Sequence, residues 1–321
     1  MVKASVIIPV FNGEKTIRPA LEALLAQTYP HQEIIVVDDG STDRTGEIVR
    51  GFNGVIYILQ QNAGPATARN AGARQARGEI ICFTDADCLA HPDWVERLVR
   101  AFGSEEIGAV AGSYGIANNE NLLARCVHEE IVYRHEKFLK DFVRAFGSYN
   151  CAIKKKVFDG VGGFDERYRG ASGEDNDLSY KILKSGQKIF FEKAALVDHY
   201  HPTQLENYLR SQFQHGFWRA KMYRDHPGMS TGDDYTFWKD MVEVVLVLGI
   251  MSALVVALAA PAFMIFLIGL LGVLLLLEFF FAVAILKKPS DAIYFAWVMF
   301  LRSFARSFAF AAGLLRFIFS K

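Results

Sequence analysis

Two carboxylates separated by one residue, Asp85 and Asp87, follow an apolar run at 79–84 in this sequence. The run is typical of a buried strand, so both acids are expected where that strand ends. Carboxylate oxygens at the start of a loop suit a hard divalent cation that keeps open positions for phosphate oxygens. Two acids with this spacing are common by chance in proteins. Their position directly after a buried strand is what supports a cation site here.

Two consecutive acids, Asp38 and Asp39, end another strand-like run at 33–37. A carboxylate at this position can accept hydrogen bonds from a nucleobase N–H or from ribose hydroxyls. A helix cap is the structural alternative, because Ser41 or Asp43 could cap the helix that follows. That alternative accounts for one acid but not for two in a row.

A second acidic cluster places three acids within 174–177, where a helix at 177–185 is expected to begin. Acids complement the dipole at a helix N-terminus, but three exceed what one cap needs. A carboxylate here could instead serve as a general base that accepts a proton from a hydroxyl group. Farther along, His199 or His201 could complete a metal site, and a purely structural histidine is the alternative.

The elements that position these residues alternate along the first part of the chain. Strands are expected at 5–10, 33–37, 55–59, 79–84 and 108–113, with helices at 16–27, 43–50, 66–76 and 92–102. Short Val/Ile runs between helices predict a mostly parallel sheet that is covered on both faces, an α/β fold. Ligands of such sheets bind beyond the carboxyl ends of the strands. The first strand lacks the GxGxxG pattern of dinucleotide-binding folds, which disfavours a hydride-transfer enzyme.

Composition excludes several classes of protein. The 321 residues are 51% hydrophobic and carry no net charge, which argues against disorder. No dense block of Lys and Arg indicates a nucleic-acid-binding protein. The four cysteines form no CxxC pair and fit small buried side chains in a reducing compartment. No secretory signal peptide is expected at the N-terminus.

The C-terminal part differs in composition from the rest of the chain, because it is apolar and carries few charges. From Met241 onward, 81 residues contain six Lys or Arg and three Asp or Glu, and the segment 244–286 has one charge, Glu278. One helix over that segment would be roughly 65 Å long, more than twice a hydrocarbon core of about 30 Å. Two membrane spans at about 242–260 and 262–286, broken at Pro261, are therefore expected, and a buried soluble hairpin is the alternative.

Two features of this region bear on topology and function. Glu278 is either a functional residue within the second span or lies near a helix end and reaches the headgroups. A third helix at about 292–319 carries three arginines and is interpreted as interfacial or as a further span. Lys287 and Lys288 place the end of the second span, and hence the large N-terminal part, on the cytoplasmic side.

The order of these motifs resembles family 2 glycosyltransferases, which have the Rossmann-like GT-A fold. The matching segments lie at 6–12, 36–43, 62–70, 85–87, 162–165 and 173–175, and the resemblance covers about residues 3–220. It implies a GT-A catalytic domain over 1–230 and a C-terminal transmembrane helical anchor over 231–321. The tail is similar to that of membrane-attached members that make exopolysaccharides or lipid-linked glycans.

The resemblance also implies roles for individual residues. Those that would contact the nucleotide-sugar donor are Pro9, Val10, Phe11, Asp38, Asp39, Arg69, Asp85 and Ala86. Asp87 and His199, with His201 as the alternative, would hold Mg²⁺ or Mn²⁺ on the diphosphate. Asp175 would be the catalytic base, and Glu174 would orient the acceptor.

The expected function is thus an inverting, metal-dependent transfer of one sugar to a hydroxyl of a lipid-linked or membrane-associated glycan. Processive members carry a QxxRW motif, and the run at 214–219 has different spacing, which favours a single transfer. A polyprenyl-phosphate sugar synthase is the alternative. Its acceptor phosphate is already charged, so an acidic cluster favours a hydroxyl acceptor instead. A non-catalytic membrane scaffold is the remote alternative.

Overall fold

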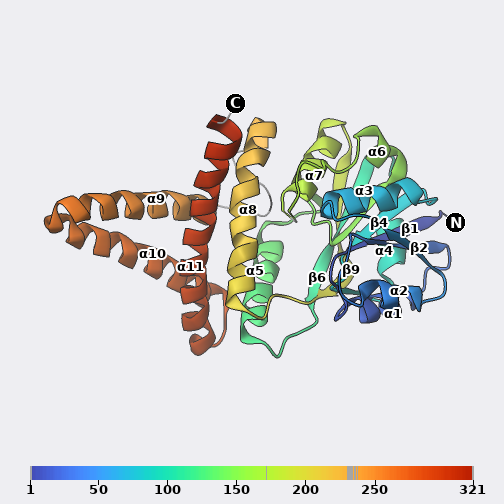
Figure 1. Cartoon of the computed structure of the whole chain (residues 1–321), viewed down its shortest axis with the longest axis horizontal. Coiled ribbons are helices and arrows are strands. Elements are labelled where there is room, and N and C mark those ends of the chain that lie inside the picture. The colour runs from blue at the N-terminus through green and yellow to red at the C-terminus, as the bar shows by residue number, and fades with distance from the viewer. Residues whose placement is uncertain (1, 171, 230–233, 235, 237, 320–321) are drawn as a thin grey trace. The chain divides into compact units, whose positions relative to one another are not determined.

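The computed structural model describes residues 2–170, 172–229, 234, 236 and 238–319. These residues form two compact units, one made of 1–118 and 138–200 and the other of 119–137 and 201–321 (Figure 1). The expected boundary at 230 lies outside the described residues. The helix at Leu205–Asp225, expected within the catalytic domain, belongs to the second unit instead.

The first unit is built on a nine-stranded sheet in the order β3-β2-β1-β4-β8-β6-β9-β5, with β7 paired to β9. The strands are β1 Ala4–Val10, β2 Gln32–Asp38, β3 Val55–Leu59, β4 Ile80–Thr84, β5 Cys88–Ala90, β6 Ile107–Ile116, β7 Phe142–Val143, β8 Asn150–Lys154 and β9 Lys188–His199. The half formed by β1 to β4 is parallel, as expected. The other half is mixed, because β8 runs antiparallel to both β4 and β6, and β5 runs antiparallel to β9.

Helices cover both faces of this sheet. They are α1 Ile17–Leu25, α2 Thr45–Arg50, α3 Pro65–Gln75, α4 Trp94–Arg100, α6 Lys155–Gly160 and α7 Glu174–Lys184. Neighbouring residues of a strand point to opposite faces, so Ile8 packs in a core with α1 and α4 while Ile7 packs in a second core with α3 and α7. This alternation fixes α3 and α7 on one face, and both carry candidate site residues.

The second unit is helical. Its helices are α5 Leu122–Phe138, α8 Leu205–Asp225, α9 Trp238–Ala259, α10 Met264–Ile285 and α11 Pro289–Leu314, with short turns at Pro227–Met229, Pro261–Phe263 and Leu315–Phe319. Among the described residues, three helical segments are long and apolar enough to cross a membrane: Trp238–Ala259, Pro261–Ile285 and Pro289–Phe317. The chain therefore breaks at Pro261 as expected, and the third helix also meets the criterion for a span.

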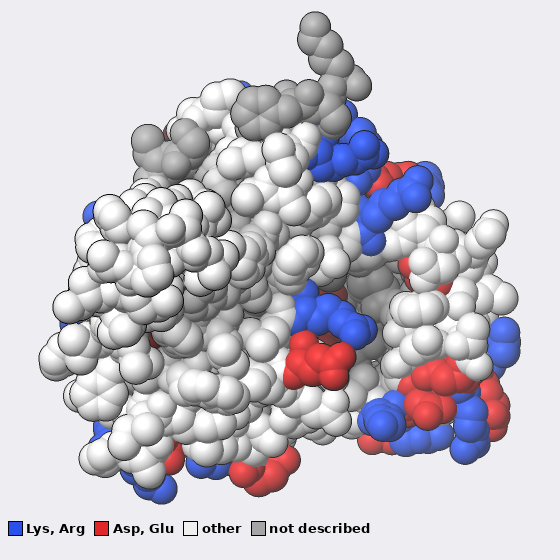
Figure 2. All heavy atoms as spheres, turned by 60° about the vertical axis from the view of Figure 1, so that its left-hand side comes forward, with Lys and Arg blue, Asp and Glu red and all other residues white. Residues whose placement is uncertain are grey.

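The exposed faces of α9 and α10 are apolar. Val245, Leu258 and Ile265 have 69, 78 and 80% of their surface exposed. Figure 2 is turned so that α9 and α10 come forward, and it shows a broad face with few Lys, Arg, Asp or Glu side chains. Such a large exposed apolar surface is expected of helices that contact lipid.

Charged side chains inside the second unit pair with one another. Glu278 is fully buried and accepts a hydrogen bond of 2.7 Å from Lys239, which also contacts Glu243. Glu278 thus lies within the helical body and does not reach outward. The structure therefore excludes the expected alternative in which Glu278 reaches the headgroups. Charged residues within apolar helices are usually stabilised by pairing, as Glu278 is by Lys239.

Candidate active site

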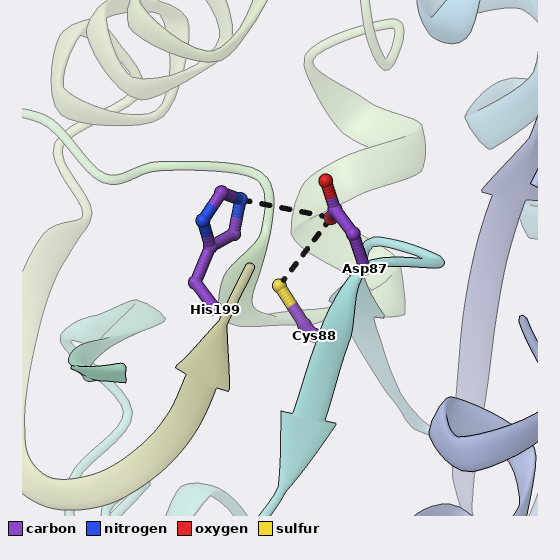
Figure 3. Close-up of side chains that lie close together, drawn as sticks. All are labelled: Asp87, Cys88 and His199. Atoms are coloured by element: carbon purple, nitrogen blue, oxygen red, sulfur yellow. Dashed lines mark hydrogen bonds and ion pairs between the residues drawn. The ribbon is translucent and has the colours of Figure 1, made fainter. Parts of the chain in front are cut away.

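The carboxyl end of β4 and the end of β9 come together at one edge of the sheet. Asp85, Ala86 and Asp87 form the loop between β4 and β5, and β5 then pairs antiparallel with β9 so that Cys88 lies opposite His199. This register brings the His199 Nε2 atom to 3.6 Å from Asp87 Oδ1 (Figure 3). This contact joins the two residues expected to bind a metal ion.

Burial affects the ionisation of Asp87. Burial raises the pKa of the Asp87 carboxyl group, nearby His199 lowers it and Asp85 raises it again. His199 lies edge-on to Tyr114, whose ring stacks on that of Tyr149 at a centroid distance of 3.9 Å. Burial disfavours the charged form of the Asp87 carboxyl group, so a bound cation would stabilise the carboxylate.

The donor set in this cluster fits a divalent cation. Asp87, Cys88 and His199 each offer one ligand atom, and these atoms lie within 4.8 Å of one another. Carboxylate and imidazole ligands both occur in Mn²⁺ and Zn²⁺ sites. His201, the alternative ligand, belongs to the second unit, where its ring lies 5.5 Å from that of His128.

Arg69 joins the loop after β4 to the start of α7. Its Nη2 donates a hydrogen bond to Asp85 Oδ1 at 2.8 Å, and its Nη1 donates to Glu174 Oε1 at 2.9 Å. Only 2% of Arg69 is exposed, and its guanidinium lies 5.5 Å from the centre of the Phe164 ring. Burial lowers the pKa of Arg69, but the two carboxylates outweigh it and raise the pKa above its usual value. Arg69 therefore provides a fixed positive charge between two candidate acids.

Glu174 and Asp175 begin α7, directly after Gly173, which has a φ of 89°. Burial and the neighbouring Asp175 raise the pKa of Glu174 to about 8, and Arg69 opposes this shift. The pKa of Asp175 is also raised, mainly by burial. Asp175 is half-buried and accepts a hydrogen bond from the Asn176 backbone N–H at 2.8 Å. A carboxyl group with a raised pKa in a half-open position can act as a general base near neutral pH.

Asp38 is the last residue of β2, and Asp39 follows it at the carboxyl end of that parallel strand. Asp38 accepts hydrogen bonds from the Ser41 N–H at 2.8 Å and the Tyr57 hydroxyl at 2.7 Å. Both oxygens of Asp39 are engaged as well, by the side chain of Gln60 and the backbone N–H groups of residues 63 and 64. A carboxylate has about four acceptor positions, so each acid keeps capacity for a further donor.

The end of β1 provides an open surface beside these acids. Pro9 and Val10 are buried within the strand, whereas Phe11 is 52% exposed. Asn12 follows with a φ of 53°, and its side chain accepts a hydrogen bond from the Thr42 N–H at 2.8 Å. Phe11 thus stands at a rim where a flat ring system could stack on it.

Sequence reasoning missed several residues that shape the site. Cys88 was expected to be no more than a buried apolar side chain, although its position directly after Asp87 was visible in the sequence. Asn70 lies in a segment that carries the family resemblance, but its contact could not be predicted: its amide both donates to and accepts from the backbone of Phe164. The pairing of β5 with β9 left no periodic signal, because β5 has only three residues.

Comparisons with known proteins agree with this arrangement. The sequence profile described as glycosyl transferase family 2 matches residues 5–162. AglE, a glycosyltransferase of Haloferax volcanii, is 31% identical over 220 residues, covering 66% of this chain and 71% of AglE. YdaM, a probable glycosyltransferase of Bacillus subtilis, is 33% identical over 61% of this chain, and GlyA of Streptococcus pneumoniae is 29% identical over 60%. The matches span 50% of YdaM and 30% of GlyA.

Solved structures show the same fold. A mannosyltransferase from Pyrobaculum calidifontis, solved with GDP-Man and Mn²⁺, has a TM-score of 0.60 at 20% identity and covers 100% of this chain and 88% of its own. GalNAc-T7, solved with UDP, GalNAc and Mn²⁺, has a TM-score of 0.51 at 19% identity, covering 74% of this chain and 52% of its own. The matched profile, the similarity to AglE and this shared GT-A fold show that the chain belongs to glycosyl transferase family 2.

Proposed function

We propose that this protein is an inverting, metal-dependent glycosyltransferase that moves one sugar from a nucleotide-sugar donor to a hydroxyl of a lipid-linked or membrane-associated glycan. One observation carries the proposal. Arg69 contacts Asp85 on the donor side and Glu174 beside Asp175, so a single guanidinium joins the two acidic clusters. A site that transfers a group between two substrates needs both clusters at one sheet edge.

The donor would bind across the ends of β1, β2 and β4. Phe11 provides an exposed aromatic face for the nucleobase, and Asp39 and Asp85 provide acceptors for base and ribose. Asp87 and His199 would hold Mg²⁺ or Mn²⁺, which when bound neutralises charge on the leaving diphosphate. The solved relatives that contain GDP-Man or UDP together with Mn²⁺ support this class of donor and cation.

Asp175 would accept the proton of the acceptor hydroxyl. Its raised pKa makes the carboxylate a better proton acceptor near neutral pH, and its half-buried position leaves it open to a substrate. Attack by that oxygen opposite the leaving diphosphate inverts the configuration at the sugar carbon. Glu174, held by Arg69, would position Asp175 in the first turn of α7 and orient the acceptor.

The second unit supports an acceptor that is held at a membrane. Its three apolar helical segments are suited to span a bilayer, and Lys287 and Lys288 favour a cytoplasmic position for the catalytic unit. Membrane lipids would surround these helices. An acceptor attached to a lipid would then diffuse in the same membrane that holds this protein. Its effective concentration at the catalytic unit would be higher than that of a free acceptor in solution.

A donor screen tests the proposed activity. Purified full-length protein in detergent would be incubated with UDP-, GDP- and dTDP-sugars in Mg²⁺ or Mn²⁺, and release of the nucleoside diphosphate would be measured. We expect one donor to be consumed in a cation-dependent manner, and faster when a lipid-linked glycan is added. Absence of release from every donor with and without lipid acceptors would contradict the proposal.

The variant Asp175→Asn tests the base. Asn cannot accept the hydroxyl proton, so we expect the turnover rate to fall by about 10²–10⁴-fold while the donor still binds. Asp159→Asn is the matched control, because Asp159 is an exposed acid on α6 that pairs with Lys155. Retained turnover in Asp175→Asn would overturn the assignment and favour a phosphate acceptor, which needs no base.

A further inference from the structure

The cation site proposed above contains a third potential ligand, the thiol of Cys88. We propose that Asp87, Cys88 and His199 together form a three-ligand site for a borderline divalent cation such as Zn²⁺ or Co²⁺, with the Cys88 sulfur bound directly to the ion. The inference rests on the proposed function only for its location at the diphosphate end of the donor site. It adds a thiolate ligand and a metal preference that a donor site made of oxygen and nitrogen ligands would not have.

The distances suit such a site. The Cys88 sulfur lies 3.9 Å from Asp87 Oδ1, and His199 Nε2 lies 3.6 Å from the same oxygen. A tetrahedral Zn²⁺ with bonds of ordinary length would separate sulfur and oxygen by about 3.6 Å, and oxygen and nitrogen by about 3.3 Å. Closure onto an ion therefore requires shifts of a few tenths of an ångström for these two pairs. The third pair, sulfur to imidazole, lies within 4.8 Å, and a tetrahedral ion would bring it to about 3.6 Å.

The backbone holds the three side chains from two adjacent strands. Cys88 and His199 are directly paired residues of β5 and β9, and their side chains turn toward the carboxylate of Asp87 (Figure 3). The Cys88 N–H donates to the carbonyl of Asp85 at 3.1 Å, and the Tyr200 N–H donates to the carbonyl of Asp87 at 3.0 Å. These bonds fix the loop that carries two of the ligands, as a preorganised metal site requires.

The chemistry of the three ligands selects among cations. Thiolate and imidazole favour Zn²⁺ and Co²⁺, whereas Mg²⁺ prefers oxygen ligands and gains little from sulfur. Binding of Zn²⁺ would displace the thiol proton to solvent and form a metal–sulfur bond. Three protein ligands leave a fourth position open for water or a diphosphate oxygen. Zn²⁺ is therefore expected to bind more tightly than Mg²⁺ and to compete with it.

Co²⁺ provides a direct spectroscopic test, because a thiolate bound to Co²⁺ gives a charge-transfer band in the near ultraviolet. Full-length protein in detergent would be titrated with Co²⁺ alone, without donor, and then with Zn²⁺. We expect the band to appear at one Co²⁺ per chain and to disappear as Zn²⁺ displaces it. The variants Cys88→Ala and Cys88→Ser should lack the band, and His199→Gln should weaken Co²⁺ binding.

Cys82→Ala is the matched control, since Cys82 is another buried thiol of the same unit, on β4. It should keep the band, and circular dichroism would confirm that all variants are folded. Absence of the band in the unmodified protein, or its persistence in folded Cys88→Ala, would overturn the inference. Neither result depends on turnover, so cation-dependent donor release without the band would refute the Cys88 ligand alone. The band without any donor release would refute the proposed function alone.

Discussion

Arg69 connects the two acidic clusters, Asp85 with Asp87 and Glu174 with Asp175. It is buried, and it donates one hydrogen bond to Asp85 and one to Glu174. Its charge also lowers the pKa of nearby Asp175, against the upward effect of burial. We propose that Arg69 positions these carboxylates and favours the ionised form of the proposed base.

A base must be deprotonated, so the rate falls as the pH drops through the pKa of Asp175. Removal of the Arg69 charge raises that pKa, so the acid limb should move to higher pH. Arg69→Lys keeps the charge but cannot bridge both acids, so it should lower kcat and leave the acid limb near its original position. Equal acid limbs in Arg69→Met and the unmodified protein would contradict this role.

At the scale of elements, α3 must lie close to the sheet to bring Arg69 into the site. Gly72 permits this approach, because a Cβ atom there would lie 2.5 Å from Ile7 and 3.2 Å from Val37. The helix carries Arg69 three residues and Asn70 two residues before Gly72. A displacement of α3 would therefore move the guanidinium that joins the two clusters.

Gly72→Ala is expected to destabilise the protein by about 1–3 kcal/mol, the usual cost of overpacking a core. Activity should fall as well, since Arg69 moves with the helix. Thermal unfolding and donor turnover would be compared with Gly103→Ala, where an added Cβ meets nothing within 4 Å. If both glycine variants behaved alike, close packing of α3 would not be what positions Arg69.

The sequence predicts the parallel half of the sheet well and the mixed half poorly. Strands β1 to β4 are short Val/Ile runs between helices, which is a local pattern, and the acids after β2 and β4 follow from it. The pairing of β5 with β9 joins residues about 110 positions apart and depends on tertiary packing. The local pattern therefore does not predict that Asp87, Cys88 and His199 lie close together, and only the family resemblance indicates a site shared by Asp87 and His199.

A chain of ion pairs connects α5 with two of the membrane helices. Arg302 on α11 contacts Glu130 on α5 at 2.6 Å, and Glu130 also contacts Arg134 at 2.7 Å. Arg134 in turn lies 2.9 Å from Asp240 on α9. Burial raises the pKa of Glu130, but the arginines, Arg302 first, outweigh it and hold the pKa well below its usual range. Glu130 is thus a buried carboxylate that needs its cationic partners.

We predict that Arg302→Met destabilises the second unit by about 3–5 kcal/mol, because it leaves Glu130 with a buried, partly unpaired charge. The double variant Glu130→Gln, Arg302→Met should recover part of this loss. Thermal unfolding in detergent would measure both, with Arg210→Met as a control for an exposed pair on α8. A single variant as stable as the control would mean that the buried pair contributes little.

At the scale of the whole molecule, the two units are interleaved along the chain. The second unit takes α5 from between β6 and β7 and α8 from after β9, and it joins them to the three apolar helices. Leu123 and Cys126 of α5 pack in one core with Tyr208 of α8 and with Phe295 and Met299 of α11. The membrane-associated unit is thus more than a C-terminal anchor appended to a complete soluble domain.

This architecture predicts that a chain ending at residue 229 will not behave as a soluble enzyme, although it keeps every proposed site residue. Removal of α9 to α11 uncovers the apolar faces of α5 and α8 that pack on α11, and it leaves Glu130 without Arg302. Exposed apolar surface of this kind promotes aggregation. We expect the truncated chain to aggregate or require detergent, as measured by size-exclusion chromatography after expression without detergent.

A version of the truncated chain with polar substitutions on those faces provides the control. Leu123→Gln and Tyr208→Gln alter side chains that face α11 within the second unit and lie outside the catalytic unit. If packing on α11 is the reason for aggregation, these changes should increase the monomeric fraction of the truncated chain and lower the stability of the full-length protein. A monodisperse chain ending at 229 with normal donor turnover would show that α5 and α8 are stable without the membrane helices, and that the anchor is separable after all.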